Sequence, residues 1–240
     1  MKMDILYWKN LSKKIRLVHT KKQFYKQYLY KLEIYAPGCK SIREDNIPAS
    51  LDRRLTFARD YNYGGSWVSS RMKTYLQEAD AEFLHLLKDI SPDYPQLKFI
   101  TQEPKYQVYG NSEADIRNFV NALPSEYKDS IILLSYPEDS EAEQLLSQNC
   151  ILKKRQPKFT HKIIFRERQF PNQSRLQIYN YLLSLGDIVQ IPPHTKEQLT
   201  KGHGWLWGTY FYSNDPGLAD FLKLIEPNLI REVCPLVYTV

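Results

Sequence analysis

The sequence contains little glycine, little cysteine and no long apolar run. Only 9 of the 240 residues are glycine, which argues against a glycine-rich phosphate-binding loop. The three cysteines, Cys39, Cys150 and Cys234, lie far apart, so they suit reduced thiols better than a disulfide framework or a zinc site. No stretch reaches the roughly 18 apolar residues of a membrane-spanning helix, and the polar N-terminus is unlike a secretory signal. We therefore expect a cytoplasmic protein without a membrane partner.

Catalytic motifs are also missing. The chain has no Walker loop, no GxSxG elbow and no GxGxxG, and its histidines lack metal-ligand spacing. Glu78 and Glu82 fall at helical spacing, which is typical of a solvated surface. His203, between Gly202 and Gly204, is the histidine whose neighbours favour exposure. We therefore expect no metal, no cofactor and no enzymatic activity.

Positive charge is plentiful and unevenly distributed. The net charge is +6, and apolar residues make up 42% of the chain, which is ordinary for a globular protein. Residues 1–43 carry eleven Lys and Arg against two acids, and residues 153–175 carry eight against one. The remaining body is acidic. Two basic segments on such a body favour a polyanionic partner, although basic runs can also be merely solvated faces.

An internal repeat indicates the fold. Three pairs of segments match: 108–111 with 211–214 at an offset of 103, 134–136 with 236–238 at an offset of 102, and 30–35 with 161–166 at an offset of 131. In both halves the hydrophobic periodicity changes between strand-like and helix-like in the order β-α-β-β-α-β. We therefore predict an α+β protein of tandem ferredoxin-like units with antiparallel four-stranded sheets.

The expected boundaries follow from this order. The expected segments are a first unit at 1–136 with a basic N-terminal arm, an irregular basic insertion within it at 37–66, a long helix at about 69–89, a linker helix at 137–158 and a second unit at 159–240.

Alternation along the central strands separates two faces of each sheet. The apolar set should face the helices: Leu32, Ile34, Val108, Ile163, Phe165 and Phe211. The opposite face and its surroundings then supply the candidate nucleic-acid-binding residues: Lys31, Tyr35, Tyr109, Lys162, Arg166, Arg168, His203, Trp205, Trp207, Tyr210 and Tyr212. Basic residues beside aromatic rings suit a single strand, since bases stack on the rings and cations neutralise phosphates.

Two families share parts of this pattern. The platform resembles RNA-recognition-motif domains in plan, and "KGHGWLWGTYFY" is loosely similar to the third-strand signature of that family, which is otherwise absent. Tandem ferredoxin-like domains in a basic chain of this size also resemble Cas6-type CRISPR RNA endonucleases. Those enzymes grip RNA with a glycine-rich loop near the C-terminus, where this chain reads "LIEPNLIR".

Three hypotheses about function follow. The first is a non-catalytic accessory protein that binds single-stranded DNA or RNA, of the kind that a phage or virus uses in replication or transcription. The second is a structural or adaptor protein whose basic and aromatic surfaces dock a protein partner. The third is an RNA endonuclease, which the second resemblance implies.

Overall fold

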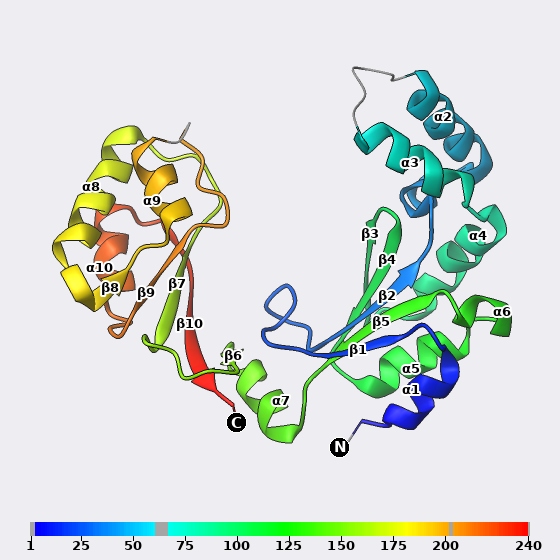
Figure 1. The fold of residues 1–240 in the computed structure, drawn as a ribbon, viewed down its shortest axis with the longest axis horizontal. Helices are drawn as coiled ribbons and strands as arrows, with labels where there is room; N and C mark the ends of the chain where they lie inside the picture. Colours follow the sequence, from blue (N-terminus) through cyan, green and yellow to red (C-terminus); the bar gives the residue numbers. More distant parts are fainter. Residues whose placement is uncertain (1–2, 61–66, 202–203, 240) are drawn as a thin grey trace. The chain divides into compact units, whose positions relative to one another are not determined.

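The computed structural model describes residues 3–60, 67–201 and 204–239. It divides into two compact units, Met1–Glu143 and Gln144–Val240. Each unit is a mixed α+β structure built on one five-stranded sheet (Figure 1). Among the described residues, no helix combines the length and apolarity needed to cross a membrane.

The first sheet has the strand order β1-β5-β2-β4-β3. Its strands are β1 (Arg16–His19), β2 (Tyr30–Tyr35), β3 (Lys98–Gln102), β4 (Lys105–Gly110) and β5 (Ile131–Tyr136). β1 runs parallel to β5, whereas the four strands from β5 to β3 pair antiparallel. The expectation of a purely antiparallel, four-stranded sheet was therefore wrong, because a short strand of the N-terminal arm joins the edge.

Helices cover one face of this sheet (Figure 1). The helical segments are α1 (Ile5–Leu11), η1 (Cys39–Arg43), α2 (Ile47–Asp60), α3 (Trp67–Gln77), α4 (Ala81–Ile90), η2 (Ser91–Asp93), α5 (Glu113–Asn121) and α6 (Ser125–Lys128). α5 packs closely on β4, where a Cβ on Gly110 would come within 3.2 Å of the Ile116 side chain. The buried Trp8 of α1 donates its indole N–H to Glu113 at the start of α5. The N-terminal helix is thereby attached to the helical layer.

The insertion at 37–66 is not irregular where it is described. It forms η1 and α2, and Pro48 occupies the second position of α2, where its missing N–H costs no helical hydrogen bond. The helix expected at 69–89 is two helices, because Asp80 caps the start of α4 by accepting the N–H groups of Glu82 and Phe83. Proline in the segment 37–66 wrongly suggested an irregular structure, and the continuous apolar pattern at 69–89 wrongly suggested a single helix.

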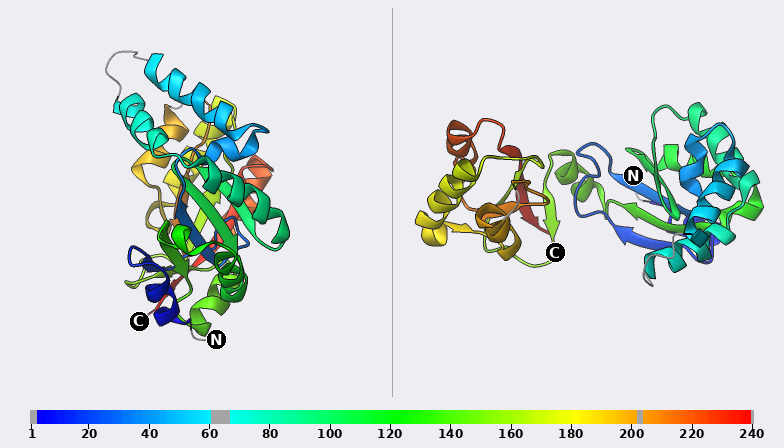
Figure 2. Two further views of the ribbon diagram at one scale, coloured as in Figure 1. Left: turned by 90° about the vertical axis from the view of Figure 1, so that its right-hand side faces the viewer. Right: turned by 90° about the horizontal axis from the view of Figure 1, so that it is seen from above.

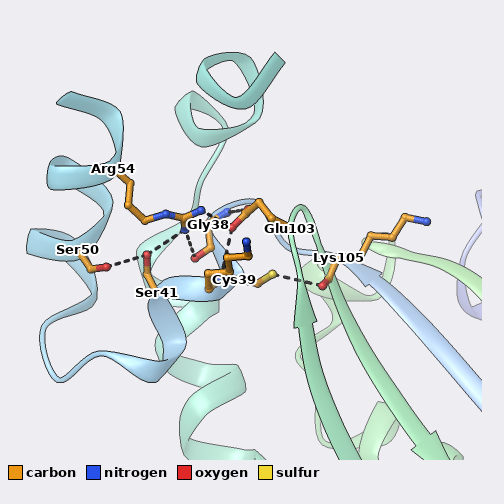
Figure 3. A network of polar contacts seen from close by, with 8 residues as sticks. Gly38, Cys39, Ser41, Ser50, Arg54, Glu103 and Lys105 are labelled. Carbon is orange, nitrogen blue, oxygen red and sulfur yellow. Dashed lines mark hydrogen bonds and ion pairs between the residues drawn. The ribbon is translucent and has the colours of Figure 1, made fainter. Parts of the chain in front are cut away.

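A polar network attaches this insertion to the β3–β4 hairpin (Figure 3). The buried carboxylate of Glu103 accepts hydrogen bonds from the Arg54 guanidinium at 2.8 Å and from the backbone N–H groups of Gly38 and Lys40. Arg54 also donates to Ser41. Because the charge of Glu103 is both paired and hydrogen-bonded, its burial is tolerated.

The second sheet has the strand order β6-β10-β7-β9-β8. Its strands are β6 (Ile151–Lys153), β7 (His161–Phe165), β8 (Val189–Gln190), β9 (Tyr210–Ser213) and β10 (Ile230–Tyr238). β6 runs parallel to β10, and the four strands from β10 to β8 are antiparallel. Here too the predicted four-stranded antiparallel sheet was wrong. β6 lies in the segment 137–158 that was expected to be a linker.

The remaining helical segments are α7 (Ser140–Ser147), α8 (Asn172–Ser184), η3 (Gly186–Ile188), α9 (Pro193–Thr200) and α10 (Leu218–Ile225). α8 and α10 cover one face of the second sheet, as Figure 2 shows from two further directions. Ile178 and Leu182 of α8 and Leu222 of α10 are fully buried against Phe165 and Phe211 of the sheet. The opposite face, which α8 and α10 do not cover, is called the helix-free face of this sheet.

The two sheets share their strand order, strand directions and pairing register. Lys31 on β2 lies opposite Tyr109 on β4, and Lys162 on β7 lies opposite Tyr212 on β9. These pairs are related by the offsets of 131 and 103 that the sequence predicts.

Both sheets also contain a bulge at the same place. Ile132 is the extra residue in β5, between the residues that pair with Glu33 and Ile34 of β2. Arg231 is the extra residue in β10, between the residues that pair with Ile164 and Phe165 of β7. This pairing makes Leu134 equivalent to Val233, and not to Leu236 as the sequence match suggested. The sequence match is displaced because the connection into the last strand is shorter in the second unit.

Candidate nucleic-acid interface

The alternation predicted along the central strands is confirmed. All six residues expected to face the helices are fully buried: Leu32, Ile34, Val108, Ile163, Phe165 and Phe211. Their neighbours in sequence therefore point to the helix-free face of each sheet. The two helix-free faces nevertheless differ in what covers them.

In the first unit, the β1–β2 connection folds over the helix-free face. Phe24, Tyr25 and Tyr28 surround the ring of Tyr109, with ring centroids 5.0–6.2 Å away. Tyr109 is only 3% exposed, and its hydroxyl donates to Gln107. The prediction that Tyr109 is accessible was wrong, because a loop of the same chain occupies the space in which a base would stack.

The cations of this face are already paired. Glu33, whose side chain is 5% exposed, accepts hydrogen bonds from the Nζ atoms of Lys31 and Lys105 at 2.7 Å each. Burial would raise the pKa of Glu33, but the two lysines outweigh it and hold that pKa below its ordinary value. Lys31 therefore has an internal carboxylate partner and is half-buried.

Tyr35 lies further along β2 and is half-buried. Its hydroxyl donates to Glu78 at 2.7 Å. Burial, and then this carboxylate, raise the pKa of Tyr35 to about 12, so the phenol remains neutral at physiological pH. Two of the three candidates in the first unit thus have internal acidic partners, and the third is covered.

In the second unit, the equivalent residues are partly accessible. Lys162 places its Nζ 3.5 Å from the centroid of the Tyr210 ring, a cation–π contact. Tyr210 and Tyr212 meet edge to face with their centroids 5.3 Å apart. Burial, and then the neighbouring Tyr210, raise the pKa of Tyr212 to about 12. Two aromatic rings and a lysine thus lie together on the helix-free face.

The β6–β7 connection forms a pocket at one end of this face. Phe159 lies nearly parallel to Tyr212, with centroids 6.4 Å apart and planes 16° apart. The space beside them is about 260 Å³ and is lined by Lys153, Arg155, Gln156, Pro157, Lys158, Phe159, Gln190, Tyr212 and Leu236. None of these lining residues is acidic. The basic run at 153–175 is evident in the sequence, but nothing in the spacing of these lysines and the arginine shows that they face Tyr212.

The other candidates lie beyond the end of β7. Residues 166–170 and 204–209 run side by side through backbone hydrogen bonds: Phe165 N to Thr209 O, Leu206 N to Arg168 O and Phe170 N to Gly204 O. Arg166 and Arg168 on the first segment are exposed. His203 lies outside the described residues.

Trp205 and Trp207 are stacked on one another, with centroids 5.2 Å apart, and are 44% and 56% exposed. The backbone of Trp207 is held by α9, since its N–H donates to Gln198 at 2.6 Å and its carbonyl oxygen lies 2.9 Å from His194 Nε2. The pair is thus an exposed aromatic surface on an anchored backbone.

The described residues contain no group of three or more His, Cys, Asp or Glu side chains that could hold a metal ion. Cys39, Cys150 and Cys234 are buried and belong to no disulfide. Burial raises the pKa of the Cys39 thiol to about 12, which makes that group a poor nucleophile.

Comparison with known proteins gives no family for this chain. No protein-family model matches the sequence, and no curated protein matches it.

Proposed function

We propose that this protein binds single-stranded nucleic acid through the helix-free face of its C-terminal unit. One observation carries the proposal: Lys162, Tyr210 and Tyr212 lie together on the helix-free face, beside a pocket whose lining residues include cations and no acid. Stacking of bases on such rings contributes about 1–3 kcal/mol per base, and each lysine or arginine neutralises phosphate charge. A face with partly accessible rings favours unpaired bases over a duplex, whose bases are already stacked.

We further propose that the two units are duplicated ferredoxin-like domains, each extended by a parallel edge strand. The shared strand order, the Lys–Tyr register and the bulge at the same position support this interpretation. Bulges are kept within protein families, so a bulge in the same place is stronger support than a shared strand order. After duplication, one helix-free face would have been closed by its own loop, and the other would have kept the binding role.

The direct test is fluorescence anisotropy with single- and double-stranded DNA and RNA at two salt concentrations. We expect single strands to bind more tightly than duplexes, with affinity falling as salt increases. Lys162→Ala should weaken binding, whereas Lys223→Ala should not, because Lys223 on α10 pairs with Asp220 on the helical side. Equal, salt-independent binding of all four probes would contradict the proposal. Cleavage of the RNA during the assay would instead support an endonuclease.

A second function, docking of a protein partner, is favoured by one observation. The stacked Trp205 and Trp207 expose two large rings, and tryptophan is enriched at the centres of protein interfaces. Under this alternative, replacement of both tryptophans would abolish partner binding and leave oligonucleotide binding unchanged.

A further inference from the structure

The pocket beside Tyr212 has walls that are fixed by the fold. At one end of the β6–β7 connection, Thr160 donates its N–H to the Asn214 side chain at 2.9 Å and accepts the Leu236 N–H at 2.7 Å. At the other end, the carbonyl oxygen of Lys153 accepts the Thr239 N–H. Residues 154–159 therefore lie between two anchored ends, and the side chain of Phe159 is buried.

The charge of this pocket exceeds what one internal nucleotide needs. Lys153, Arg155 and Lys158 line it, and no carboxylate among the described residues forms an ion pair with any of the three. An internal phosphodiester carries one negative charge, whereas a terminal phosphate carries about 1.5 to 2 at pH 7. Three clustered cations around a small space are thus better matched to a phosphate monoester.

The other walls suit a nucleobase. Tyr212 presents a neutral ring, Leu236 adds an apolar surface, and the exposed Gln190 offers an amide that can both donate and accept hydrogen bonds. A volume of about 260 Å³ is close to the lower end of ordinary ligand pockets, which begin at about 300 Å³. The pocket therefore has room for about one nucleotide.

The first unit shows what would abolish such a site. Its equivalent connection, residues 20–29, also carries lysines, but Phe24, Tyr25 and Tyr28 fill the space over Tyr109. The connection in the second unit is shorter and places one ring, Phe159, beside Tyr212. The difference leaves an open pocket in the second unit.

We propose that this pocket binds a nucleotide that carries a terminal phosphate, with the base against Tyr212 and the phosphate held by Lys153, Arg155 and Lys158. The inference rests on the proposed function, because it treats the pocket as part of the same nucleic-acid-binding face. The same chemistry is presented by the phosphorylated end of a strand and by a free nucleoside monophosphate.

The test compares oligonucleotides of one sequence that end in a 5′-phosphate, a 3′-phosphate or only hydroxyl groups, together with free adenosine and uridine 5′-monophosphates. Binding is followed by anisotropy and by competition. We expect at least one phosphorylated end to bind about tenfold more tightly than the hydroxyl form, since charge-assisted hydrogen bonds to phosphate are stronger than neutral ones. The double variant Arg155→Ala, Lys158→Ala should abolish this preference. The matched control is Lys154→Ala, which removes one charge from the same loop but does not line the pocket.

The outcomes separate the two proposals. If phosphorylated and hydroxyl ends bind equally, with salt-dependent affinity, the pocket proposal is overturned and the proposed function remains. If the monophosphates bind at this pocket and oligonucleotides do not, the pocket proposal stands and the proposed function is wrong. If neither binds to protein whose circular dichroism shows it to be folded, both are wrong. A preference that survives the double variant would place the phosphate elsewhere.

Discussion

Tyr109 and Tyr212 occupy the same register position in their two sheets, each opposite a lysine, and of the two only Tyr212 is partly accessible. The difference comes from the connection that precedes the first central strand. In the first unit it covers the tyrosine with three aromatic rings, and in the second it lies to one side and leaves a pocket. One position thus stabilises the fold in one unit and is available for binding in the other.

Replacement of these two tyrosines should have opposite effects. Tyr212→Ala should weaken binding of a single-stranded oligonucleotide by about 1–3 kcal/mol with little change in the salt dependence, because a stack is removed and no charge is. Tyr109→Ala should lower the free energy of unfolding by about 3 kcal/mol and leave binding by the folded protein unchanged. Anisotropy and chemical denaturation of both variants measure this difference. If Tyr109→Ala weakened binding as much as Tyr212→Ala, the assignment of the interface to the second unit would be wrong.

The lysines opposite these tyrosines should also differ. Lys162→Ala should reduce the slope of log affinity against log salt by about 0.7 for each phosphate of a single strand that the variant no longer neutralises. Lys31→Ala should leave the slope unchanged, because Lys31 lies opposite Tyr109, which the β1–β2 connection covers. Titrations at four salt concentrations give the two slopes. Similar slopes for both variants would count against a single interface.

Glu33 should make the first unit sensitive to acid. Its two lysine partners lower its pKa below the ordinary 4.5, so it binds a proton less readily in the folded state than in the unfolded state. The stabilisation is therefore fully present above pH 4.5 and is lost as the pH falls through the folded-state pKa. Glu33→Gln should remove this contribution at neutral pH, and its stability should fall less steeply than that of the parent below pH 4.5. Denaturation curves from pH 7 to pH 3 compare the two, and parallel pH profiles would show that Glu33 contributes nothing.

Trp205 and Trp207 provide an optical measurement of the strand's path. If the bound strand continues from Tyr210 along the chain toward Trp205, oligonucleotides should quench tryptophan fluorescence, and the double variant Trp205→Phe, Trp207→Phe should abolish the quenching. Trp8 is fully buried in the first unit and should not respond. Tight oligonucleotide binding without any quenching would favour the use of this pair for a protein partner.

The sequence predicted the faces of the central strands correctly, because strict alternation at positions such as Leu32 and Phe211 follows directly from strand geometry. It could not predict the cover over Tyr109, since that contact joins a loop to a strand far along the chain. It also missed α2, because Pro48 is equally compatible with a turn and with the first turn of a helix. The sequence could not predict the pocket around Arg155 either, since its lining also joins a loop to strand residues far along the chain.

The short parallel edge strands have a consequence for the order of folding. Leu17 pairs with Leu134, and Ile151 pairs with Leu236, so neither edge strand can pair until the last strand of its unit is present. Contacts between residues this far apart require costly loop closure and slow the search for the native topology. During vectorial synthesis, β1 and β6 would leave the ribosome long before their partners. Each unit can therefore complete its sheet only after its final strand has been translated.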